Sequence, residues 1–288
     1  MPENIKLLIL ARTNPNISDT YVETVCTAGI TPEGQWIRLY PLPVRLHKKN
    51  LGKKYEWITC QVQVNETWKD ARPESRKVVD RGSIEVVGSV TTGKNHDWLE
   101  RRRLLLNDQL PIYTKKEDIL RGAKNNEFSL CLFKPNQIEH FYAEDDSEEY
   151  SARDLARIRK HQQQGVLFDF DDQIHPKDLP FIKVPYTFHC RFRDDTGAVM
   201  NLSVLDWEMS SLYRSCMSSE KQKEKAKIKT LQKYEYFIKT RDVYFVLGTR
   251  NDDHNKLINS KNPNCHINPW SIISVIPFAK QIQMELNL

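Results

Sequence analysis

The chain has 288 residues and a formal net charge of +5 at pH 7. Hydrophobic residues make up 39% of it, enough to bury a core, which excludes a wholly disordered chain. The apolar run at residues 7–11 is far shorter than the roughly 20 residues that a membrane span requires. Residues 1–4 lack the basic start of a signal peptide, so we expect a cytoplasmic protein without membrane contact.

The cysteines and glycines exclude several common functional motifs. None of the six cysteines forms a C-x-x-C pair, which excludes a zinc ribbon and a thioredoxin motif. The ten glycines form neither G-x-x-x-x-G-K-[ST] nor G-x-G-x-x-G, which disfavours an ATPase or a dinucleotide enzyme. His254, Cys265 and His266 lack a fourth zinc ligand, and Cys26 lies in an expected strand. We therefore expect no metal, no cofactor and no cysteine nucleophile.

The first half of the chain predicts mainly β-structure, because apolar or alternating runs are separated by polar turns. Strands are expected at residues 5–11, 21–30, 35–41, 58–64, 83–90 and 128–132. The second and third flank Thr31-Pro32-Glu33-Gly34, where proline and glycine fit a type I turn, so these two strands should form a hairpin.

Helices are expected where capping residues precede amphipathic or basic segments. Asn95 should cap a helix to Leu106, and Thr114-Lys115-Lys116-Glu117 matches a capping box for a short helix that ends near Gly122. Ser151 should begin a basic helix to residues 162–164. Ser219 and Gln222 should begin a lysine-rich helix to about Thr240.

The acidic stretch at residues 144–149 predicts an exposed linker, because like charges repel. In the second half, Phe188, Cys190 and Phe192 alternate with His189, Arg191 and Arg193, which predicts a strand with one basic, solvated face. Further strands are expected at residues 198–207, 243–247 and 271–277.

The expected fold is therefore α+β. It consists of two small, mainly antiparallel β domains, barrel-like or half-open, each with one or two packed helices. We predict an N-terminal domain at residues 1–143, an acidic linker and helix at 144–165, and a C-terminal domain at 166–288.

Four short motifs lie in both halves of the chain. They are ETVCTAGI at residues 23–30, WIRLYP at 36–41, RPES at 72–75 and LDWE at 205–208. Together they resemble an uncharacterised family of bacterial proteins without an assigned activity. The resemblance implies a bacterial intracellular setting and carries over no catalytic residue.

Basic and aromatic residues concentrate after the first expected hairpin. Trp36, Arg38 and Tyr40 share one face of a strand, and a lysine-rich segment without acidic residues follows. Aromatic rings stack on bases at about 1–3 kcal/mol each, and cations neutralise phosphates. These features predict a nucleic-acid-binding module that contacts DNA or RNA beside a separate catalytic partner. The predicted binding residues are Arg38, Tyr40, Arg45, Lys48, Lys49, Arg72 and Arg76. The alternative is a solvated sheet face with an ordinary lysine loop.

A second basic surface is expected where the strand face with His189, Arg191 and Arg193 meets the basic helix at residues 153–160 or the lysines at 221–229. A solvated lysine-rich helix is the simpler explanation of the last segment.

Two further functions stay open, and the sequence does not decide whether the chain is an enzyme. Asp206 and Glu208 could hold Mg²⁺ in a nuclease, but Ser210 stands where the usual pattern has a lysine. Asp206-Trp207-Glu208 could instead begin a helix. The third hypothesis is a protein-interaction scaffold whose basic segments bind an acidic partner.

Overall fold

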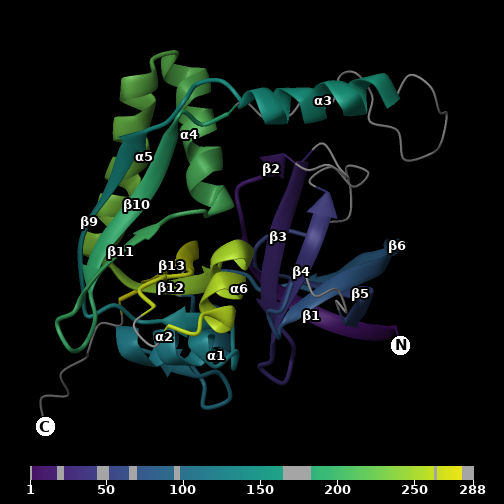
Figure 1. Cartoon of the computed structure of the whole chain (residues 1–288). Coiled ribbons are helices and arrows are strands. Elements are labelled where there is room, and N and C mark those ends of the chain that lie inside the picture. Colours follow the sequence, from purple (N-terminus) through teal and green to yellow (C-terminus); the bar gives the residue numbers. More distant parts are fainter. Residues whose placement is uncertain are drawn as a thin grey trace, which may run out of the picture.

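The structure is a computed structural model that describes residues 2–17, 23–43, 52–64, 70–93, 98–164, 183–262 and 265–280. Within these ranges the chain forms three β-sheets and six helices. Figure 1 shows the first sheet at one side of the molecule and the second sheet at the other, with the third sheet between them. The mainly antiparallel sheets and packed helices confirm the predicted α+β class.

The first sheet has six strands in the order β1-β5-β6-β4-β3-β2. Their bounds are Glu3–Arg12 for β1, Asn16–Ile17 for β2, Glu23–Ile30 for β3, Trp36–Pro43 for β4, Glu56–Val64 for β5 and Ser75–Ser89 for β6. Because β1 also pairs with β3, five of these strands close into a ring. The predicted hairpin is present as β3 and β4, and the predicted alternation along β5 buries Ile58, Cys60 and Val62.

The second sheet has the order β11-β10-β9. Its strands are β9 (Gln137–Asp145), β10 (Tyr186–Arg193) and β11 (Val199–Ser203). Helices α4 (Trp207–Glu220) and α5 (Lys223–Thr240) cover one of its faces, to which Phe188, Cys190 and Phe192 point. This confirms the predicted alternation along β10, whose other residues are half-buried.

The third sheet has the order β13-β12-β8-β7 and joins the two halves of the chain. Its strands are β7 (Ile112–Tyr113), β8 (Leu130–Phe133), β12 (Arg241–Thr249) and β13 (Trp270–Ala279). The remaining helices are α1 (Leu99–Leu105), α2 (Lys116–Lys124), α3 (Ala152–Gln164) and α6 (Asn251–Asn259).

One core cluster contains Leu8 and Leu10 of β1 together with Leu132 of β8 and Val246 of β12, so the halves share buried apolar surface. The predicted domain boundaries stay a prediction.

Two local predictions were wrong. The strand expected at 198–207 ends at Ser203, and α4 begins at Trp207. The capping box at Thr114 does not form. Lys115 occupies the N-cap position of α2, and its side chain makes no capping hydrogen bond. The carboxylate of Asp194 accepts the Lys116 amide at 2.8 Å instead. Across the ranges that the structure describes, no helix has the length and apolar content that crossing a membrane requires.

Candidate functional site

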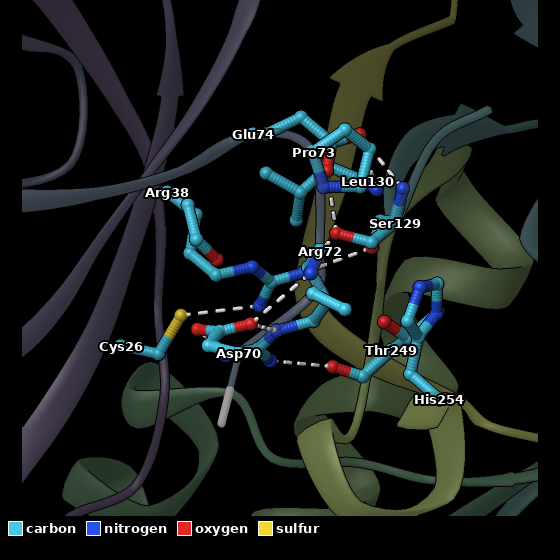
Figure 2. Close-up of polar contacts among 12 residues, drawn as sticks. Cys26, Arg38, Asp70, Arg72, Pro73, Glu74, Ser129, Leu130, Thr249 and His254 are labelled. Atoms are coloured by element: carbon cyan, nitrogen blue, oxygen red, sulfur yellow. Dashed lines mark hydrogen bonds and ion pairs between the residues drawn. The ribbon is translucent and has the colours of Figure 1, made fainter. Parts of the chain in front are cut away.

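Strand β4 positions Arg38 in the interior of the molecule. Its guanidinium donates to the backbone oxygen of Ser129 at 2.9 Å, to the Ser129 hydroxyl at 3.1 Å and to the Cys26 sulfur at 3.3 Å (Figure 2). Ser129 directly precedes β8, so Arg38 ties β4 of the first sheet to the third sheet. The side chain is only 2% exposed, because the third sheet covers the face on which it lies.

Arg72 lies in the same buried cluster and reaches the second half of the chain. It donates to the two Asp70 carboxylate oxygens at 2.7 and 2.8 Å and to the Thr249 carbonyl at 3.0 Å (Figure 2). Burial alone would raise the pKa of Asp70. The hydrogen bonds and the charge of Arg72 instead hold this pKa below its ordinary value. The pair is therefore charged and closed to solvent.

Glu74 completes this arrangement, which we call the seam: Cys26, Arg38, Asp70, Arg72, Glu74, Ser129, Thr249 and His254. The Glu74 carboxylate accepts the Ser129 amide at 2.7 Å, the Leu130 amide at 3.2 Å and the Ser129 hydroxyl at 2.5 Å. The RPES motif thus supplies an arginine and a glutamate that tie β6 to β8 and β12. Paired charges and satisfied amides give the seam a structural role.

The predicted exposed basic face was wrong for Arg38 and Arg72, because both side chains are buried in the seam. Tyr40 is half-buried, with the Arg72 guanidinium 5.9 Å from its ring centre. Arg76 donates to the carbonyls of Pro73 and Ser75. Arg45, Lys48 and Lys49 lie outside the described residues, so their contact with nucleic acid stays a prediction.

Asp206 begins α4, as the helix-start interpretation of its motif predicts. One carboxylate oxygen accepts the Glu208 amide at 2.9 Å, which is an N-cap, and the other accepts the Val275 amide of β13 at 2.9 Å. Burial raises the pKa of Asp206 against the opposing charge of Lys54. With both oxygens bound to backbone amides and the residue buried, Asp206 is poorly placed to hold Mg²⁺.

Lys54 is the residue near this motif that sequence reasoning missed. Its ammonium contacts the Glu208 carboxylate at 2.7 Å and the Val275 carbonyl at 3.0 Å. The sequence shows the lysine only as one member of a basic run, because a partner 154 residues away leaves no spacing signal.

The open face of the second sheet is the remaining place where basic and aromatic residues meet. We call it the ring face and define it as His140, Tyr142, His189, Arg191, Arg193 and Asn201. The Tyr142 and His189 rings stack across β9 and β10, with centres 5.2 Å apart and planes at 19°. The His140 ring lies next in the row, 5.5 Å from Tyr142. Strands β9 and β10 thus bring rings from two distant segments onto one surface.

The lysine-rich helix does not join the ring face. Tyr234 of α5 packs on Phe141, whose side chain points to the opposite side of β9 from its neighbours His140 and Tyr142. Several α5 lysines pair with carboxylates instead: Lys223 with Glu148, Lys227 with Glu224 and Lys229 with Glu220. These ion pairs agree with a solvated helix.

Two family models, both for domains of unknown function, match the chain. Residues 114–285 match the domain of unknown function DUF8757. The chain belongs to this family. Residues 3–107 match a second domain of unknown function, DUF8758. These matches agree with the resemblance to an uncharacterised family. No curated protein matches the DUF8757 chain.

Proposed function

We propose that the protein binds single-stranded nucleic acid on the ring face, in the bacterial cytoplasm and beside a separate catalytic partner. The row of rings formed by His140, Tyr142 and His189 next to two arginines carries this proposal. Bases stack on aromatic and imidazole rings whatever their sequence, and arginines neutralise the phosphates between them.

The geometry of the face favours contact with an extended strand. Tyr142 accepts a hydrogen bond from the Asn201 amide at 2.6 Å, which fixes the ring between β9 and β11. His140, at the outer end of the row, is exposed, and its ring is tilted by 48° to that of Tyr142. A base can extend this stack with little rearrangement of the protein.

The charges of the face leave donors for phosphates. Arg191 and Arg193 share one carboxylate, that of Glu139, at 2.7 and 2.9 Å. Two guanidiniums with a single counter-charge retain net positive charge and unused N–H groups. Their side chains are 42% and 41% exposed, so a phosphate reaches them without unfolding the sheet.

Fluorescence anisotropy with labelled single-stranded DNA and RNA tests the proposal. Loss of one stacking ring costs about 1–3 kcal/mol, so Tyr142→Ala should weaken binding by about 5- to 150-fold. Arg191→Ala should also weaken binding and should reduce the slope of affinity against salt concentration.

An exposed tyrosine and an exposed lysine on α5 provide the controls. Tyr236→Ala and Lys225→Ala change a tyrosine and a cation on the far side of the second sheet, and both should bind like the unchanged protein. Equal affinity for Tyr142→Ala and Tyr236→Ala would overturn the proposal. Different affinities for DNA and RNA would identify which of the two nucleic acids the protein prefers.

A further inference from the structure

Arg101 of α1 lies between two aromatic residues with unusual backbone conformations. Tyr55 has φ = 69° and Trp98 has φ = 60°, in the left-handed region that bulky side chains rarely adopt. The Arg101 guanidinium carbon is 3.7 Å from the Tyr55 ring centre and 4.8 Å from that of Trp98. The Arg101 Nε donates to the Val90 carbonyl at 3.0 Å, whereas its two terminal nitrogens have no partner among the described residues. The guanidinium is thus held firmly, and its terminal nitrogens keep N–H donors that no described residue uses.

The Tyr55 hydroxyl is a buried polar group without a hydrogen-bond partner among the described residues. Tyr55 is only 5% exposed. Burial raises the pKa of Tyr55, and the charges of Lys54, Arg101, Glu208 and Asp206 also act on its hydroxyl, which therefore lies within electrostatic range of two cations and two carboxylates. A buried donor without a partner is costly, which indicates that an acceptor binds there.

Lys54 supplies a second cation beside the same ring. Its ammonium is 5.6 Å from the Tyr55 ring centre and is held by Glu208 and the Val275 carbonyl. The Lys54 side chain is 12% exposed, whereas that of Glu208 is 54% exposed. Glu208 therefore reaches in from solvent and can leave without disturbing the core.

We propose that Lys54, Tyr55 and Arg101 form a binding site for a phosphate group, where the Glu208 carboxylate stands in for the anion. A phosphate offers acceptors for the lysine, the tyrosine hydroxyl and the free guanidinium nitrogens together, which one carboxylate cannot. The site is separate from the ring face and does not depend on it.

Titrations of the full chain followed by ³¹P NMR test this site, with inorganic phosphate and phenyl phosphate as separate probes. Arg101→Met and Lys54→Met should each weaken binding about tenfold, the effect of one lost charge-assisted hydrogen bond. Glu208→Gln should strengthen binding several-fold, because the competing charge is removed. Tyr55→Phe keeps the ring and should weaken binding by a smaller factor.

Neighbouring residues give matched controls. Lys53→Met and Arg103→Met remove exposed cations next to Lys54 and Arg101, and they should bind like the unchanged protein. If inorganic phosphate binds and phenyl phosphate does not, the ligand is free phosphate. If phenyl phosphate binds as well, the ligand is a phosphomonoester. The proposal is overturned if neither probe binds the unchanged protein or Glu208→Gln. It is also overturned if Arg101→Met binds like Arg103→Met, or if Glu208→Gln weakens binding.

Discussion

His254 shows how a single buried side chain in the seam links stability to pH. Its Nε2 lies 2.8 Å from the Asn126 side-chain oxygen, and the Asn126 amide donates to the Ala71 carbonyl. This orientation of Asn126 assigns the imidazole proton to Nε2. Burial, Arg72 and Arg38 lower the pKa of His254 to about 4.

The folded protein should therefore lose stability on acidification. An unfolded histidine takes up a proton near pH 6.5, whereas folded His254 resists protonation until about pH 4, so falling pH favours the unfolded state across this window. His254→Gln keeps an N–H donor for Asn126 but does not titrate. Between pH 7 and pH 5, the free energy of unfolding should fall by about 1–2 kcal/mol more in the unchanged protein than in His254→Gln.

Urea unfolding of both proteins at several pH values gives this difference, because all other titrating groups are common to the two chains. Parallel pH dependences would contradict the role assigned to His254.

At the scale of elements, ring closure depends on the close approach of β1 and β3. Gly29 of β3 pairs with Ile9 of β1, and a Cβ atom at Gly29 would overlap the Leu8 carbonyl oxygen. Since backbone cannot move aside as a side-chain tip can, any larger residue must push the two strands apart.

Gly29→Ala should therefore destabilise the protein by at least about 2 kcal/mol, within the range that overpacking produces. Gly88→Ala on β6 is the control, because its Cβ would lie 4.0 Å from the nearest atom, in Trp57. Thermal unfolding of both variants measures the contrast. A Gly29→Ala protein as stable as Gly88→Ala would show that the strands separate at little cost.

The elements that the sequence predicts are those with a clear apolar period. Alternation along β5 and β10 and the hairpin of β3 and β4 are confirmed for this reason. The sequence left the start of α4 at Asp206 as one of two alternatives and did not predict its extent, because serines interrupt its apolar pattern; the Asp206 cap and packing on the core stabilise the helix. The capping box at Thr114 failed because Asp194, far along the chain, caps α2 instead.

At the scale of the whole molecule, tertiary packing decides which polar faces are exposed. Strand parity correctly places Trp36, Arg38 and Tyr40 on one side of β4, but parity does not reveal that another sheet covers that side. Arg38 therefore ties the first sheet to the third, and Arg72 joins the two halves of the chain, which also share an apolar core. The ring face is visible in the sequence only as the alternation around His189, because its other rings come from β9, more than 40 residues earlier.

Ultraviolet cross-linking of a saturating single-stranded oligonucleotide, with the attached peptides identified by mass spectrometry, locates the nucleic acid directly. The ring face predicts cross-links within β9 (Gln137–Asp145) and β10 (Tyr186–Arg193), at His140, Tyr142 or His189. Cross-links confined to residues 36–54, or none at saturation, would contradict binding on this face.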